Sequence, residues 1–226
     1  MPVVRLSPKS TRFPPAEWAD DAYDGLVAVG GDLSVKRLLS AYTSGIFPWF
    51  EEEGVLYWFS PDPRFLLLPE NFRIPKSLKR VLKKAPFRIT VDEAFPEVIR
   101  QCATVPRRHE EGTWISDRFV EGYTALHEAG FAHSVEAWDG ETLAGGFYGV
   151  AIGACFFGES MFARLPDASK CAFATFATAF FERGGAMIDC QQHTDHLARF
   201  GAVDTPRAAF LARLREAVTA SIRADP

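Results

Sequence analysis

The feature of the sequence that most constrains the fold is a two-residue turn, Asp139-Gly140, set between two apolar runs. Residues 132–138 and 142–152 have the pattern of β-strands, and an Asp-Gly pair between two strands favours a tight antiparallel hairpin. A third strand is expected over about residues 154–161. We therefore expect an antiparallel hairpin at the centre of the fold, which a doubly wound parallel sheet does not have.

Helices and further strands surround this hairpin in the sequence. Apolar side chains recur at helical spacing after several residues that can cap a helix. The expected helices lie at about 35–44, from Ser77 to Lys84, after Asp92, from Ser116 to before Gly130, up to Gly184, and at roughly 206–222, and the short strands at 65–68, 87–91 and 187–191. This order predicts an α+β fold with a mixed, largely antiparallel sheet, similar to the N-acetyltransferase architecture.

The first 64 residues differ from the rest of the chain in residue composition and pattern. Residues 47–50 and 58–64 combine tryptophan, phenylalanine and proline. Because proline donates no backbone hydrogen bond and restricts the residue before it, we expect these passages to be irregular but rigid. Trp49 and Trp58 then look exposed enough to stack on a base, although core packing is the simpler interpretation of each. We place a boundary between a small N-terminal α/β domain (1–64) and a larger domain (65–226).

Composition and charge restrict the class of protein. The chain has 226 residues, 47% of them hydrophobic, and a formal net charge of −4. No run approaches the ~20 apolar residues of a membrane helix, and residues 1–5 lack an apolar signal core. The four cysteines show no close pairing, so we expect neither a disulfide framework nor a paired-cysteine zinc site. These features indicate a cytoplasmic protein that is not a general polycation.

A basic segment stands out against the acidic total. Residues 76–84 carry five cations, spaced to cover one broad face of a helix: Lys76, Lys79, Arg80, Lys83 and Lys84. Most charge runs are simply solvated faces. A concentrated basic strip in an acidic protein can also contact phosphates and position an RNA without reading its sequence. The segment alone does not decide between the two.

Three familiar site patterns are not matched. Gly158-Glu159-Ser160-Met161-Phe162 lacks the second glycine of a nucleophile elbow, and Gly158 is expected inside a strand. The glycines of 145–149 match neither a dinucleotide nor a coenzyme A loop, so no nucleotide or coenzyme A cofactor is expected. Cys190, His193 and His196, with Asp189 and Asp195, follow no common zinc spacing. We therefore expect no metal, and we place His193 and His196 on a solvated turn.

Taken together, the motifs resemble a known family. They occur in this order: Asp24-Gly25-Leu26, Val29-Gly30-Gly31-Asp32-Leu33, Tyr42, Gly45-Ile46-Phe47-Pro48-Trp49, Ser60-Pro61-Asp62-Pro63-Arg64, Gly112-Thr113-Trp114-Ile115, His133-Ser134-Val135-Glu136, Gly158-Glu159-Ser160-Met161-Phe162, Ser169-Lys170 and Ile188-Asp189-Cys190-Gln191. Over about residues 13–207 the chain resembles bacterial leucyl/phenylalanyl-tRNA–protein transferases.

The resemblance implies a function and partners. Members move Leu or Phe, and less readily Met, from aminoacyl-tRNA to the α-amine of proteins that begin with Arg or Lys, which marks those proteins for degradation. It also implies a small N-terminal domain joined to an acetyltransferase-like catalytic domain, with neither coenzyme A nor a metal. We expect the protein to be a monomer.

The resemblance also implies a set of site residues. The reactive set is Glu159, Asp189 and Gln191. The pocket for the Leu or Phe side chain would be lined by Phe147, Phe156 and Phe176, the terminal adenosine would be surrounded by Trp49, Trp114 and Tyr123, and the five cations of residues 76–84 would contact the tRNA backbone.

The chemistry of these residue types fits such a transfer. An aminoacyl ester is already activated, so the enzyme mainly has to align it with a neutral amine. Asp189 is a poor base at an ordinary carboxyl pKa, but it could attract a cationic acceptor or orient Gln191. If Asp189 and Gln191 lie two apart on one strand, both point to the same side and Cys190 points into packing.

Two departures from the family pattern concern the site. Phe59 stands where a second tryptophan is usual, and Phe173 replaces a frequent leucine near Phe176, which predicts a tighter pocket and an altered preference between Leu and Phe. Two other functions remain open: an acyl-coenzyme A-dependent N-acetyltransferase, and a non-catalytic tRNA-binding module.

Overall fold

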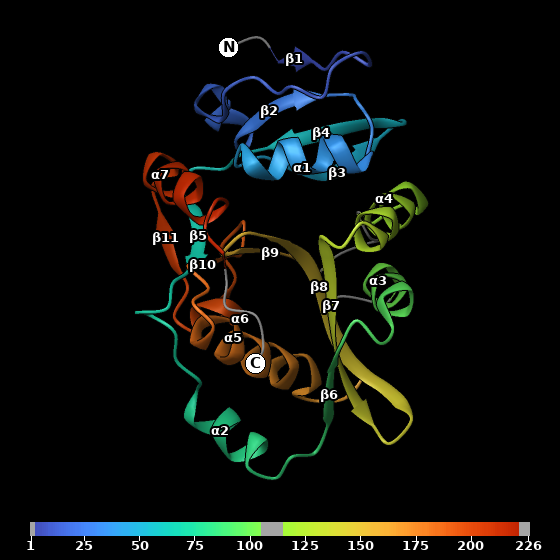
Figure 1. Ribbon diagram of the computed structural model, residues 1–226, viewed down its shortest axis with the longest axis vertical. Helices are drawn as coiled ribbons and strands as arrows, with labels where there is room; N and C mark the ends of the chain where they lie inside the picture. Colours follow the sequence, from blue (N-terminus) through green and yellow to red (C-terminus); the bar gives the residue numbers. More distant parts are fainter. Residues whose placement is uncertain (1–2, 105–114, 222–226) are drawn as a thin grey trace.

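The computed structural model describes residues 3–104 and 115–221 (Figure 1). The N-terminal part is a four-stranded sheet in the order β1-β2-β4-β3, packed against helix α1 (Val35–Thr43). Its strands are β1 (Val4–Arg5), β2 (Leu26–Val29), β3 (Phe47–Glu52) and β4 (Val55–Phe59). The expected small N-terminal α/β unit is therefore present.

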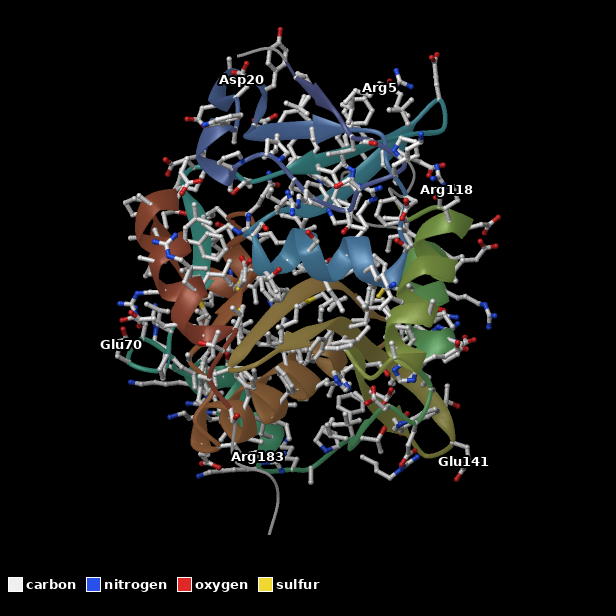
Figure 2. All side chains as sticks on the ribbon, turned by 45° about the horizontal axis from the view of Figure 1, so that its top comes forward. Arg5, Asp20, Glu70, Arg118, Glu141 and Arg183 are labelled. Carbon is white, nitrogen blue, oxygen red and sulfur yellow. The ribbon has the colours of Figure 1, made fainter. Side chains whose placement is uncertain are left out.

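The larger part is a seven-stranded sheet in the order β11-β5-β10-β9-β8-β7-β6. Its strands are β5 (Arg64–Leu67), β6 (Arg88–Val91), β7 (Ala132–Asp139), β8 (Thr142–Ile152), β9 (Cys155–Ala163), β10 (Met187–Asp189) and β11 (Val203–Thr205). The expected hairpin is confirmed, since β7 and β8 pair in antiparallel fashion up to Asp139 and Thr142, and Figure 2 shows Glu141 at its tip. Of the pairs in this sheet, β9 with β10 is parallel. The α+β class and the mixed, largely antiparallel sheet are confirmed.

Helices cover both faces of this sheet (Figure 1). They are α2 (Lys76–Leu82), α3 (Phe95–Thr104), α4 (Asp117–Glu128), α5 (Ala168–Glu182), α6 (Asp195–Ala198) and α7 (Arg207–Ala217). One apolar cluster lies under α5, and the other lies under α3 and α4 and continues into the N-terminal part. The seven-stranded sheet is thus buried on both faces, which gives it the stiffness to carry a site.

The expected boundary coincides with the change from one sheet to the other. Strand β4 ends at Phe59 and β5 begins at Arg64. The two parts nevertheless share one apolar cluster, in which Tyr42 and Ile46 belong to the same core as Phe157. Whether residues 1–64 form an independent domain stays a prediction.

The prediction that residues 47–50 and 58–64 are irregular is wrong for residues 47–50 and 58–59, which lie in strands. Pro48 lies in β3, opposite Trp58 of β4, beside a register shift between Pro48 and Phe50. Because β3 is an edge strand, a residue without an N–H can be accommodated there. Trp58 is not exposed: its ring is fully buried and its Nε1 donates to the Gly30 carbonyl oxygen at 2.7 Å. Core packing is therefore its role.

Candidate active site

A fork between two strands opens a cavity in the larger sheet. Strands β9 and β10 pair in parallel as far as Phe157 and Asp189. Strand β10 ends there, and Gln191 has a φ of 63°, a left-handed conformation that turns the chain away while β9 continues to Ala163. A cavity of about 380 Å3 lies in the opening, between residues 158–161 of β9 and residues 190–197.

This geometry corrects the expected strand at residues 187–191. Asp189 and Gln191 do not share one face of a strand, because the left-handed residue breaks the alternation of side chains. Cys190 is also not simply packed away, since it lines the cavity. Asp189 and Gln191 still contact each other, through the backbone N–H of Gln191, which donates to Asp189 Oδ1 at 2.9 Å.

Asp189 is held by a residue that the motif pattern did not connect with it. Arg64, the first residue of β5, donates from Nε to Oδ1 at 2.8 Å and from Nη2 to Oδ2 at 2.7 Å, and both side chains are fully buried. The guanidinium also lies over the rings of Phe47 and Phe210. Both carboxylate oxygens of Asp189 are thus engaged. Its position suits a group that fixes the 189–191 backbone better than one that meets a cationic acceptor.

Glu159 is the central acceptor of the hydrogen-bond network beside the cavity. Its carboxylate accepts from the Tyr42 hydroxyl at 2.7 Å and from the Tyr123 hydroxyl at 2.8 Å. It also accepts from Gln191 Nε2 at 2.8 Å. The hydroxyls of Tyr42 and Tyr123 contact each other as well. Because Tyr42 belongs to α1 and Tyr123 to α4, this arrangement exists only when the N-terminal part is packed on the larger sheet.

The network shifts the ionisation of its members. Burial raises the pKa of Glu159 to about 7, although the hydrogen bonds from Tyr42, Tyr123 and Gln191 lower it. Burial, and next the negative charge of Glu159, raise the pKa of both tyrosines well above their usual value. The tyrosines therefore stay protonated donors at neutral pH, while Glu159 is poised to titrate there.

The rest of the cavity wall is mostly apolar. Phe147 and Phe156 line it, as expected, and so does Phe173. Phe176 stands behind Phe156, with the two ring centroids 4.5 Å apart, and lines a different cavity. Met161 also lines the first cavity, and the sequence pattern did not single it out. An apolar cavity with one carboxylate and one amide on its wall suits a hydrophobic group that carries a polar end.

His196 does not lie on a solvated turn. Thr194 accepts from the Leu197 N–H and so caps α6, the short helix that places His196 against the ring of Phe200 and beside the cavity. Burial lowers the pKa of His196 to about 4, so its ring is neutral at pH 7. His193 is exposed, and its Nδ1 lies 3.4 Å from the Asp204 carboxylate.

The residues expected around the terminal adenosine have different surroundings in the structure. Trp49 is half-buried in β3 and packs on Phe59, with ring centroids 4.9 Å apart. The ring of Tyr123 is fully buried and its hydroxyl binds Glu159. Trp114 lies outside the described residues. The adenosine site stays a prediction, and Tyr123 acts first as a donor to the carboxylate.

The basic segment forms α2 and is anchored by its apolar side. Leu78 is buried in the cluster under α5, whereas all five expected cations are exposed. None of the ion pairs among the described residues includes any of the five. Figure 1 shows α2 at the end of the molecule opposite the N-terminal sheet. Contact of this strip with the tRNA backbone stays a prediction.

Two further observations concern the described part of the chain. Within residues 3–104 and 115–221, no three His, Cys, Asp or Glu side chains gather where they could hold a metal ion. No helix in the same ranges has both the length and the apolar character needed to span a bilayer.

Comparisons with known proteins identify the class and the family. The profile described as leucyl/phenylalanyl-tRNA protein transferase matches residues 66–215, and the profile of its N-terminal domain matches residues 31–62. Proteins named leucyl/phenylalanyl-tRNA–protein transferase are similar over most of this chain. The one from Anaeromyxobacter dehalogenans (strain 2CP-C) is 53% identical over 96% of this chain and 92% of its own length.

A second relative of the same name, from Lawsonia intracellularis (strain PHE/MN1-00), is 53% identical over 95% of this chain and 93% of its own length. The fold, the site and these relatives together define an enzyme, an aminoacyltransferase. More particularly, the chain belongs to the leucyl/phenylalanyl-tRNA–protein transferase family.

Proposed function

We propose that this enzyme transfers Leu or Phe, and less readily Met, from aminoacyl-tRNA to the α-amine of proteins beginning with Arg or Lys, and so marks them for degradation. The observation that supports this most is the cavity of about 380 Å3, whose apolar wall ends at Glu159 and Gln191. The donor side chain would occupy the apolar part, with its ester next to the two polar groups. An apolar pocket separates side chains that differ by one methylene by only ~1–3 kcal/mol, so tolerance of several hydrophobic donors is expected.

Gln191 is proposed to bind the incoming amine. Its Nε2 donates to Glu159, which leaves the amide oxygen as an acceptor for an amine N–H. A protein α-amine has an ordinary pKa near 8, so a useful fraction is neutral at pH 7. The amine nitrogen attacks the ester carbonyl carbon, the peptide bond forms, the ester C–O bond breaks, and the ribose oxygen leaves with a proton given up by the amine.

Glu159 and Asp189 have different roles in this proposal. With a pKa near 7, Glu159 can hold the amino group of the donor when ionised, and it can pass a proton between amine and ribose. Asp189 is a positioning residue, because its oxygens are bound by Arg64 and the Gln191 N–H. The Arg64–Asp189 ion pair keeps Gln191 in the left-handed conformation that brings its side chain to Glu159.

The proposed partners are compatible with the same geometry. The five exposed cations of residues 76–84 are proposed to contact the tRNA backbone, and Trp49, Trp114 and Tyr123 to surround the terminal adenosine. Across the loop of residues 190–194 lies another cavity, whose lining includes Asp21, Asp24, Asp62 and Asp204. Its charge is compatible with acceptors that begin with Arg or Lys. Cytoplasmic location stays a prediction.

The testing experiment mixes the enzyme with leucyl-tRNA and two peptides, one starting with Arg and one with Asp. We expect Leu addition to the Arg peptide only, abolished by ribonuclease. Addition to neither peptide would contradict the proposal, and addition to the Asp peptide would assign a different acceptor class.

One variant and one further assay test the alternative functions. Gln191→Ala should bind charged tRNA normally and lose turnover, whereas unchanged turnover would support a non-catalytic binding module. Acetyl transfer from acetyl-coenzyme A to either peptide, in the absence of tRNA, would support the acyltransferase alternative.

A further inference from the structure

A second apolar cavity lies behind the one proposed to hold the donor side chain. Its volume is about 320 Å3, and it is bounded by β6, β7 and α5. Its described lining is mainly apolar: Ile89, Val91, Val135, Ala151, Phe176 and Phe180. Among the described residues, Phe156 alone lines both cavities. Phe156 is therefore the wall residue that the two cavities share.

Neighbouring groups hold this wall in place. The Phe156 side chain is fully buried, with its ring centroid 4.5 Å from that of Phe176 and 6.1 Å from that of Phe147. On the strand beside it, a Cβ on Gly149 would come within 2.5 Å of a Phe156 ring carbon, so only glycine leaves room for the ring there. The ring cannot swing aside without displacing these neighbours.

The second cavity reaches the surface of the molecule. Val91 on its wall is 56% exposed. Arg183, which follows the last residue of α5, also lines it and is exposed (Figure 2). A side chain that passed the position of the Phe156 ring would therefore enter a further apolar space with an opening to solvent.

We propose that Phe156 sets the maximum length of the donor side chain, and that the cavity behind it is an extension of the donor pocket closed by this one ring. The inference rests on the proposed placement of the donor side chain in the first cavity. A donor longer than Phe overlaps the Phe156 ring, and a close-packed wall does not yield to such an overlap cheaply. Removal of the ring joins cavities of about 380 and about 320 Å3.

The test compares Phe156→Ala with the wild-type enzyme, using tRNA charged with Leu, Phe or 4-phenylphenylalanine and a peptide that starts with Arg. We expect the ratio of kcat/KM for 4-phenylphenylalanine to that for Leu to rise by about tenfold or more. Phe156→Leu, which disturbs the core less, should show a smaller rise in the same direction. The matched control is Phe72→Ala, which makes the same truncation in the same apolar cluster at a ring that lines neither cavity, and it should leave the ratio nearly unchanged.

A second variant shows whether the added length enters the second cavity. Ala179 lines only that cavity of the two, so Phe156→Ala/Ala179→Leu should narrow it and reduce the gain while Leu transfer continues. The proposal is overturned if the Phe156 variants transfer Leu without any gain for the longer donor, or if Ala179→Leu leaves the gain undiminished. Failure of the wild-type enzyme to transfer Leu would instead contradict the proposed function.

Discussion

Arg64 and Asp189 form a bidentate ion pair in which both side chains are fully buried, although 125 residues separate them in the chain. The pair joins the first residue of β5 to the last residue of β10, at the point where the strand fork opens. Asp189 then holds the backbone of Gln191, and Gln191 holds Glu159. The chain of contacts connects the core of the sheet to the groups proposed to act on the substrates.

Loss of Arg64 should destabilise the fold more than most substitutions. Arg64→Met leaves the Asp189 carboxylate buried without its partner, and a broken buried pair costs about 3–5 kcal/mol of unfolding free energy. Arg64→Met/Asp189→Leu removes both charges and should recover most of that loss, as urea unfolding would show. Because Leu cannot accept from the Gln191 N–H, the double variant should stay defective in transfer. If it regained activity, Asp189 would not be a positioning residue.

Glu159 should give transfer a pH dependence centred near 7. Its folded pKa of about 7 lies above the ordinary value of 4.5, so the folded protein keeps a proton that the unfolded chain loses between these values. The contribution of Glu159 to folding stability is therefore fully present below about pH 4.5. It is lost as the pH rises to about 7. The kcat/KM profile should show an apparent pKa near 7 that disappears in Glu159→Gln. A profile unchanged by Glu159→Gln would assign that ionisation elsewhere.

Removal of one tyrosine hydroxyl should move that profile upward. The Tyr42 and Tyr123 hydroxyls donate to ionised Glu159 and lower its pKa. Tyr42→Phe leaves the charged form with one donor fewer, so the apparent pKa should rise by about one to two units, given ~1.5–3 kcal/mol for a hydrogen bond to a charged group. Tyr57→Phe, which removes a hydroxyl from β4, is the control and should leave the profile in place. A downward shift in Tyr42→Phe would contradict the network.

His196 should weaken the fold in mild acid. The pKa of His196 in the folded protein, about 4, lies below the ordinary value of 6.5. As the pH falls from 6.5 towards 4, the unfolded chain therefore binds a proton that the folded protein does not bind. Its contribution to stability is therefore complete above about 6.5 and is lost below it. The difference in unfolding free energy between the wild type and His196→Gln should change over this range, by at most about 3 kcal/mol. A flat difference for His196→Gln would refute the prediction.

Charge reversal on α2 should impair transfer from whole tRNA and leave transfer from a minimal donor unchanged. Lys79→Glu and Arg80→Glu replace exposed cations by anions, so KM for leucyl-tRNA should rise and its salt dependence should become less steep. Transfer from leucyl-adenosine, which lacks the phosphate backbone, should be unchanged. Arg215→Glu, on the exposed side of α7, is the matched control. Equal losses with both donors would show that α2 acts through the fold and not through phosphates.

Several elements of the fold could be predicted because their causes are local. The Asp139-Gly140 turn specifies its own hairpin, and the apolar spacing of α1 and α5 is visible within one segment. The prediction for the passage around Pro48 is wrong, since a proline is compatible with a strand at the edge of a sheet, and sequence does not show which strand is at the edge.

The candidate site, like the fold, could be predicted from the sequence only in part. The family motifs predict that Glu159, Asp189 and Gln191 act together, and the three residues are in contact. The sequence does not connect Arg64 with Asp189, because nothing local links the two residues.

By itself the sequence determined most of the turns and of the helix and strand segments, since these depend on neighbouring residues, and its motifs identified the family. Only the tertiary structure decided which groups meet. Tyr42 reaches Glu159 across 117 positions of the chain, Phe176 stands behind Phe156, and His196 is enclosed. Such contacts arise from packing of distant segments around shared cores, and burial in those cores also sets the ionisation of the site.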